Sequence, residues 1–268
     1  MRLTALVENT GNETFRGVHG LSFYIETEKH RLLFDVGPDD TLFLNAETAG
    51  IDLKSVDTVV LSHGHGDHGG ALKKFLSVND TARVYAQKSA FEPHEIRIGP
   101  FRKDGGLDPT LKDHPRVTLL RGDAVIDDEL SVFITPDQSL CPSTANRMLT
   151  ENGRRDPFLH EQSLLIHEHG KTFLIAGCAH AGILNIMKKA APERPVLCVS
   201  GFHLFNPVTG LTVRRALLQN VARGLNRYDG TVFYTCHCTG DKARAYLLSQ
   251  VKNLRALRCG DVIGETDI

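Results

Sequence analysis

The chain has 268 residues, of which 41% are hydrophobic, enough to bury a substantial core in one large domain or two small ones. Its 31 Lys and Arg residues and 32 Asp and Glu residues leave a formal charge of −1, which argues against nucleic acid or an anionic membrane as the main partner. We expect a small-molecule substrate instead. The apolar stretch at residues 3–7 is shorter than the roughly 7–15 residues of a secretory segment, and no later stretch approaches the roughly 20 residues of a transmembrane helix. These features predict a cytoplasmic protein whose six cysteines are free thiols.

Strand-like runs recur along the chain, each short, rich in Val, Ile, Leu or Phe, and bounded by Gly, Asp, Asn or His. They cover residues 3–8, 21–26, 31–36, 58–61, 83–86, 117–120, 130–135, 162–166, 172–176, 196–200 and 231–234. Apolar residues repeat every three or four positions at 182–191, 212–228 and 241–254, which predicts helices with Thr212 and either Thr239 or Gly240 as N-caps.

The order of these elements is hairpins first and then strands alternating with helices, in each half of the chain. This order predicts an α/β fold with two mixed sheets packed face to face and helices outside, in a single domain spanning residues 1–268. Two stretches, 94–115 and 136–157, look irregular, and we expect them to line the active site.

The strongest chemical signal is the run LSHGHGDHGG at residues 61–70, between the strand at 58–61 and a helix beginning near Ala71. His63, His65, Asp67 and His68 are four potential metal ligands within six residues, and the intervening glycines let the backbone turn tightly. His63 and His65, two apart on an extended segment, can share one ion, while Asp67 and His68 can reach a second. Imidazole and carboxylate suit Zn, Fe or Mn, so a metal site is favoured over a solvated polar turn.

The pattern His63-x-His65-x-Asp67-His68 resembles the signature of the metallo-β-lactamase fold superfamily, and the preceding LFDVG at 33–37 resembles its strand ending in Asp-x-Gly. This resemblance implies a four-layer αββα sandwich. Six stretches together resemble the subgroup named for 7,8-dihydropterin-6-methyl-4-(β-D-ribofuranosyl)-aminobenzene-5′-phosphate synthase. They are LVEN at 6–9, HGLS at 19–22, SHGH at 62–65, GCAHAG at 177–182, GFHL at 201–204 and CHCTG at 236–240.

The resemblance implies further ligands. His237 corresponds to the last metal-binding histidine of the superfamily. Cys178 and His180 follow the strand at 172–176, where most relatives carry Gly-Asp with a bridging carboxylate, which this chain lacks. Either Cys178 replaces that carboxylate as a thiolate, or His180 supplies the ligand and Cys178 only packs; we favour His180. His160 lies near the position of the third histidine and is either a ligand or a pocket residue.

Other residues are expected to support the site. Asp35, at a buried strand end, is expected to accept the outer N–H of a ligand histidine without touching metal. His203 follows another strand and is expected to hydrogen-bond substrate or act as an acid, unless it is structural. Arg102 and Lys103 could hold a substrate phosphate, with an ordinary charged loop as the alternative. The run HEHG at 167–170 indicates a hairpin turn and not a metal site.

These signals predict a metal-dependent hydrolase or transferase that holds one or two zinc ions, or Mn or Fe, and acts on a phosphate- or pyrophosphate-containing small molecule. A bound metal lowers the pKa of its water to about 7, and Asp67 is positioned to orient that water or accept its proton. The resemblance also implies a pterin-type transfer in which pyrophosphate leaves. The alternatives are a lactone or thioester hydrolase, diiron electron transfer or oxygen chemistry, and a metal or redox sensor using Cys178, Cys236 and Cys238.

Overall fold

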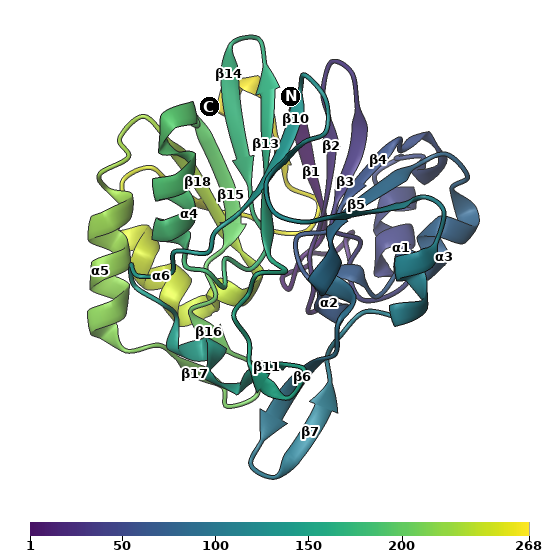
Figure 1. Cartoon of the computed structure of the whole chain (residues 1–268). Coiled ribbons are helices and arrows are strands. Elements are labelled where there is room, and N and C mark those ends of the chain that lie inside the picture. The colour runs from purple at the N-terminus through teal and green to yellow at the C-terminus, as the bar shows by residue number, and fades with distance from the viewer. Residues whose placement is uncertain (268) are drawn as a thin grey trace.

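Two seven-stranded β-sheets lie face to face in the computed structural model, which describes residues 1–267 (Figure 1). The first sheet has the order β20 (Val262–Ile263), β1 (Arg2–Val7), β2 (Ser22–Glu26), β3 (Arg31–Phe34), β4 (Thr58–Val60), β5 (Arg83–Gln87) and β8 (Val117–Leu120). The second has the order β19 (Leu254–Ala256), β18 (Val232–Cys236), β15 (Leu197–Gly201), β14 (Lys171–Ile175), β13 (Gln162–Glu168), β10 (Leu130–Ile134) and β9 (Ala124–Val125). Each sheet is mixed, as expected, because β3, β4, β5 and β8 are parallel, and so are β14, β15, β18 and β19.

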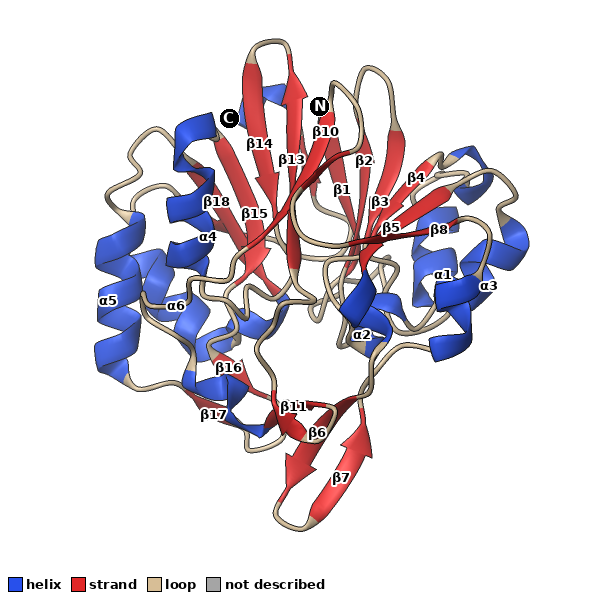
Figure 2. Ribbon diagram, in the orientation of Figure 1, coloured by secondary structure: helices blue, strands red, loops and turns tan. Residues whose placement is uncertain are grey.

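Helices cover the outer face of each sheet, which completes the predicted four-layer αββα sandwich (Figure 2). On the side of the first sheet lie α1 (Thr41–Thr48), α2 (Gly66–Gly69) and α3 (Leu72–Val78); on the side of the second lie α4 (Ile183–Ala190), α5 (Arg215–Leu225) and α6 (Asp241–Gln250). Short 3-10 helices span Leu53–Ser55, Lys88–Phe91, Pro109–Asp113, Thr144–Met148, Ala191–Glu193, His237–Thr239 and Glu265–Asp267. None of the helices in the described part of the chain has the length and apolar character needed to cross a membrane.

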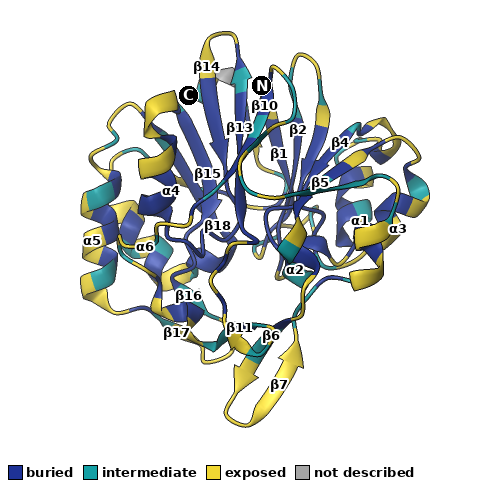
Figure 3. Cartoon of the chain, in the orientation of Figure 1, coloured by how far each residue is buried: buried dark blue, intermediate teal, exposed yellow. Residues whose placement is uncertain are grey.

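The core has three apolar clusters, as the layer order requires. The central cluster joins the two sheets and includes Phe23, Phe34, Ile175 and Val199, all without solvent exposure. The other two clusters lie between each sheet and its helices. Figure 3 shows the result, with buried residues along the strands and exposed residues on the outer faces of the helices.

Several predicted boundaries need correction. The N-cap of α5 is Arg214, because Thr212 belongs to the strand β17 (Leu211–Thr212), which pairs with β16 (Phe205–Asn206). Gly240 is the N-cap of α6, as predicted, but Leu254 is not helical. It lies in β19 and pairs with Phe233 of β18. The apolar spacing runs on past the helix because Leu247 and Leu254 contribute to one core cluster. Helix α1 was not predicted.

The two stretches expected to be irregular form a small sheet together. Its order is β12 (Arg154–Arg155), β11 (Leu149–Glu151), β6 (His94–Ile98) and β7 (Phe101–Asp104), and the β6–β7 hairpin projects away from the sandwich (Figure 1). The hairpin turn predicted at residues 167–170 is confirmed, since β13 and β14 pair from Glu168 and Lys171 onwards, with positive φ angles at His169 and Gly170.

Candidate metal centre

Several of the predicted site residues follow the carboxyl ends of parallel strands, and these ends meet at one edge of the sandwich. His63 follows β4 of the first sheet. From the second sheet, Cys178 and His180 follow β14, His203 follows β15 and His237 follows β18. Because parallel strands all end at the same edge, side chains that are far apart in the sequence come together there.

One group of donors consists of His63, His65 and His180, whose nitrogen atoms lie within 4.8 Å of one another. The Nε2 atoms of His63 and His180 are 3.3 Å apart, and the His65 and His180 rings meet edge to face with centroids 4.9 Å apart. Burial, and then the neighbouring imidazoles, hold the pKa of each of the three well below its usual value. All three rings are therefore neutral and carry the lone pair that a metal ligand needs.

A second group consists of Asp67, His68 and His237. Oδ2 of Asp67 lies 3.7 Å from Nε2 of His68 and 3.4 Å from Nε2 of His237, and those two nitrogens are 3.2 Å apart. Burial raises the pKa of Asp67, but His68, His19 and His237 outweigh it and hold that pKa well below its usual range. The carboxylate is therefore charged, and its side chain remains 25% exposed to the cavity described below.

Cys178 lies between the two groups. Its Sγ is 3.2 Å from Nε2 of His68, and it groups with His63 and His68 within 4.8 Å. The two alternatives for the missing carboxylate are thus both compatible with the geometry, because His180 faces His63 while Cys178 faces His68. Burial raises the pKa of the Cys178 thiol. The clustered imidazole, carboxylate and sulfur donors fit a divalent metal of the zinc, manganese or iron type.

Asp35 makes the contact expected of a residue that orients a ligand. Its Oδ2 accepts hydrogen bonds from His68 Nδ1 and from Ser62 Oγ, both at 2.7 Å, and its Oδ1 accepts from the Ser62 N–H at 2.7 Å. Asp35 and His68 are fully buried. The bond to Nδ1 leaves Nε2 of His68 directed towards Cys178 and His237.

Residues near the N-terminus hold the second group in place, although the sequence alone did not identify them as site residues. His237 Nδ1 is 2.8 Å from Asn9 Oδ1, and the His237 N–H donates to Glu8 Oε1 at 2.6 Å. His19 Nε2 lies 3.3 Å from Asp67 Oδ2. All three come from stretches that carried the family resemblance, which was the available signal for them.

The loop after β14 is held by two further residues that the sequence analysis missed. Glu161 accepts the N–H groups of His180 and Ala181 at 2.7 and 2.8 Å, and burial raises the pKa of this carboxyl to about 7. Asn146 Oδ1 accepts a hydrogen bond from His180 Nδ1 at 3.0 Å, and Asn146 Nδ2 donates to the His180 carbonyl at 2.8 Å. These contacts fix the His180 ring at Nδ1 and at its backbone and leave Nε2 facing His63.

His160 lies next to this centre with both ring nitrogens engaged. Nδ1 accepts the N–H of Gly64 at 2.9 Å, and Nε2 is 3.0 Å from Oδ2 of Asp156. Of the two roles left open by the sequence, these contacts disfavour that of a metal ligand.

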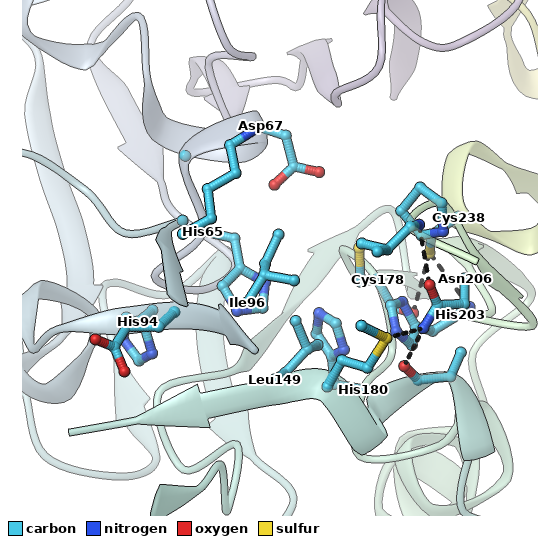
Figure 4. Close-up of a pocket in the computed structure, with 18 of the residues that line it drawn as sticks. His65, Asp67, His94, Ile96, Leu149, Cys178, His180, His203, Asn206 and Cys238 are labelled. Atoms are coloured by element: carbon cyan, nitrogen blue, oxygen red, sulfur yellow. Dashed lines mark hydrogen bonds between the residues drawn. The ribbon is translucent and has the colours of Figure 1, made fainter. Parts of the chain in front are cut away.

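A cavity of about 350 Å³ opens beside the donors (Figure 4). Its lining includes Asp67, Cys178, His180 and His237 together with apolar side chains such as Ile96 and Leu149. Both stretches expected to line the site contribute, through β6 and β7 and through β11.

Lys103 lines the cavity, whereas Arg102 is not among its lining residues. The two side chains are neighbours on a strand and point to opposite faces. Arg102 pairs with Glu95 instead, at 3.4 Å.

His203 also lines the cavity, and neither of its buried ring nitrogens has a hydrogen-bond partner among the described residues. Burial and the nearby His237 lower its pKa to about 3. The ring is therefore neutral near pH 7, which suits a hydrogen bond to substrate and does not suit acid catalysis.

Comparison with known proteins gives a consistent result. The model of the metallo-beta-lactamase superfamily matches residues 16–144. The chain is similar to 7,8-dihydropterin-6-methyl-4-(beta-D-ribofuranosyl)-aminobenzene-5'-phosphate synthase of Methanocaldococcus jannaschii, with 27% identity covering 94% of this chain and 92% of that protein. A solved structure of a metal-dependent hydrolase of the beta-lactamase superfamily shares 25% identity, covers 98% of each chain and gives a TM-score of 0.81. Zn(2+)-bound PqqB from Methylobacterium extorquens shares the fold, with a TM-score of 0.59 and 12% identity, covering 98% of this chain and all of the other.

Proposed function

Because this chain has the metallo-β-lactamase fold and resembles that superfamily in sequence, we propose that it is a metal-dependent enzyme acting on a small molecule that contains phosphate or pyrophosphate. The observation that carries the proposal is the convergence of two donor groups, His63, His65 and His180 on one side and Asp67, His68 and His237 on the other. Buried imidazoles clustered at this density around a carboxylate have few structural uses.

Each group would hold one ion, zinc or alternatively manganese or iron. Cys178 would either supply a thiolate in place of the absent carboxylate or only pack beside the ligands. A metal in this setting supplies Lewis-acid stabilisation of a negative oxygen and a more acidic bound water. Asp35, Asn9 and Asn146 hold the outer nitrogens of three ligand rings and so fix which nitrogen faces the ion.

Two residues would act on substrate directly, one of the donors and one residue beside them. Asp67 is charged and partly exposed to the cavity, so it orients the attacking group by accepting its hydrogen bond. His203 offers a neutral ring with both nitrogens unpartnered, which can donate to a substrate oxygen.

The cavity supports a substrate with an anionic group and an apolar body. Lys103 provides a positive charge at its wall, and Ile96, Met148 and Leu149 provide apolar surface. The synthase relative favours a pterin-type transfer, for which the family resemblance implies pyrophosphate as the leaving group, and the hydrolase relative favours attack by water. A lactone or thioester hydrolase and a non-catalytic sensor are the alternatives.

The test is metal removal and add-back. Protein stripped with a chelator should lose turnover of a generic aryl phosphodiester or a pterin pyrophosphate, and Zn, Mn or Fe should restore it. His65→Ala and Asp67→Ala should abolish the restored turnover while circular dichroism shows an intact fold. His169→Asn, at an exposed turn with positive φ, is the matched control and should behave like wild type.

Full activity of both variants after metal removal would refute the proposal. Tight metal binding without turnover of any phosphoester, lactone or thioester would instead identify a sensor.

A further inference from the structure

Three residues form a buried hydrogen-bonded chain beside the candidate metal centre. Asp156 lies just after β12, His160 lies just before β13, and Gly64 lies between two of the proposed ligands. The Gly64 N–H donates to Nδ1 of His160 at 2.9 Å, and Nε2 of His160 is 3.0 Å from Oδ2 of Asp156. The side chains of Asp156 and His160 have no solvent exposure.

The direction of each bond in this chain is fixed by the first donor. A backbone N–H can only donate, so Nδ1 of His160 must be unprotonated. Its proton therefore sits on Nε2 and is donated to Asp156. Burial lowers the pKa of His160, which keeps the ring in this neutral form. Burial alone would raise the pKa of Asp156, but the contacts with His160 and His94 hold it below its usual range, so the carboxylate is charged.

This arrangement leaves His160 without a lone pair for a cation, since one nitrogen accepts from Gly64 and the other carries a proton. Its Nδ1 instead fixes the peptide that joins His63 to Gly64. His63 and His65 flank this point, so the orientation of both rings depends on it. The ring of His160 also lies 5.9 Å from that of His63 and 5.5 Å from that of His65, measured between centroids.

We propose that Asp156 and His160 are positioning residues, which hold the backbone at Gly64 so that His63 and His65 face the same ion. The inference rests on the proposed metal site. It gives a role to Asp156, which was not among the predicted site residues. It also gives His160 a different role from His180, whose Nε2 faces His63 directly.

Two substitutions of His160 separate positioning from ligation. His160→Asn keeps an acceptor oxygen close to the position of Nδ1, whereas His160→Ala keeps none. Metal-free protein is titrated with Zn²⁺ against a chromophoric chelator, and the Co²⁺-loaded protein is examined by visible absorption. We expect His160→Ala to lose roughly 10–100-fold in metal affinity, as is typical when a hydrogen-bond partner of a ligand is removed, and His160→Asn to recover most of it.

A double-mutant cycle tests the link to Asp156. Asp156→Ala should weaken Zn²⁺ binding in the wild-type background and add little in the His160→Ala background, because both changes remove the same chain. His167→Ala is the control; this residue lies near the other end of β13, where its Nδ1 contacts Thr172. It should leave Zn²⁺ affinity unchanged.

Four results would overturn the inference. Equal losses in His160→Ala and His160→Asn, with a changed Co²⁺ spectrum in both, would make His160 a ligand. A lower melting temperature with unchanged Zn²⁺ affinity would make its role merely structural. A wild-type protein that takes up no metal would refute the proposed function and this inference together, whereas wild-type binding with unaffected variants refutes this inference alone.

Discussion

The Nε2 atoms of His63 and His180 lie 3.3 Å apart although 117 residues separate the two in the sequence. Both rings are buried, and burial lowers the pKa of each well below its usual value. Two neutral imidazoles can face each other in this way only by sharing a proton or by pointing at a common cation. The outer nitrogen of His180 is already held by Asn146, which favours the cation.

His180→Ala tests this relationship. Removing a direct ligand should weaken metal binding by more than the roughly 10–100-fold typical of a hydrogen-bond partner of a ligand. Metal content after dialysis and competitive Zn²⁺ titration measure the loss, and circular dichroism checks the fold. If His180→Ala retains the metal content and affinity of wild type, His180 is not a ligand and Cys178 is the remaining replacement for the absent carboxylate.

The role of Cys178 can be measured separately with Co²⁺. Burial raises the pKa of the metal-free thiol, but a coordinated thiol is deprotonated and gives a thiolate-to-cobalt absorption in the near ultraviolet. We expect this band in wild type and its loss in Cys178→Ser. Cys198→Ser is the control, since Cys198 is fully buried in the apolar cluster between the second sheet and its helices. A band that survives in Cys178→Ser would restrict Cys178 to packing.

Asp35→Asn should destabilise the fold strongly. The carboxylate accepts three hydrogen bonds, from the N–H and hydroxyl of Ser62 and from His68, and an amide nitrogen at either position would face a donor. Because it breaks one partner of a fully buried charged pair, the substitution should lower the free energy of unfolding by about 3 kcal/mol. Urea unfolding of wild type and variant measures this loss. Asp40→Asn is the control, because its exposed pair with Lys74 should contribute less than about 1 kcal/mol. Equal losses in the two variants would contradict this account of Asp35.

Much of the fold could be predicted from local patterns. The strands of both main sheets either alternate apolar and polar residues or are apolar throughout. The turn at 167–170 carries residues suited to positive φ. The small sheet could not be predicted in the same way. Its strand β7 is exposed along its whole length, and β6 pairs with β11 across a long sequence separation. Neither feature leaves a periodic signal in the sequence.

The residues of the candidate site likewise divide into those that a local sequence pattern identifies and those that only the fold brings together. The contiguous run at 61–70 identified four candidate ligands without further help, whereas those after β14 and β18 came from the family resemblance, since only sheet topology brings them together. Asp156 and Glu161 could not be found, because an isolated carboxylate before a strand is indistinguishable from a surface residue until its burial is known. Gly64 is required for a second reason besides the tight turn, because a Cβ at this position would lie 2.3 Å from the Ala90 carbonyl oxygen.

A pH-dependent contact joins the two sheets away from the candidate site. His30, in the turn between β2 and β3, has Nδ1 2.8 Å from Asp57 and Nε2 2.9 Å from Asp127, with Glu129 at 3.9 Å. Burial lowers the pKa of His30, but these carboxylates outweigh it and raise the pKa above 6.5. A raised pKa in the folded state means that protonated His30 stabilises the fold fully below the unfolded-state value of 6.5 and loses this effect as pH rises through the folded-state pKa.

His30→Gln should therefore cost stability mainly in mild acid. The difference between wild type and variant in the free energy of unfolding should be on the order of 1 kcal/mol at about pH 5.5 and should shrink at about pH 8.5. Urea unfolding at both pH values measures it, and taking the difference cancels the titration of the buried histidines that both proteins share. His114→Gln, which removes a histidine from the loop before β8, is the control for losing any partly buried histidine. A difference that stays constant or grows with pH would show that His30 is not protonated in the folded protein, and that its contacts with the three carboxylates are those of a neutral ring.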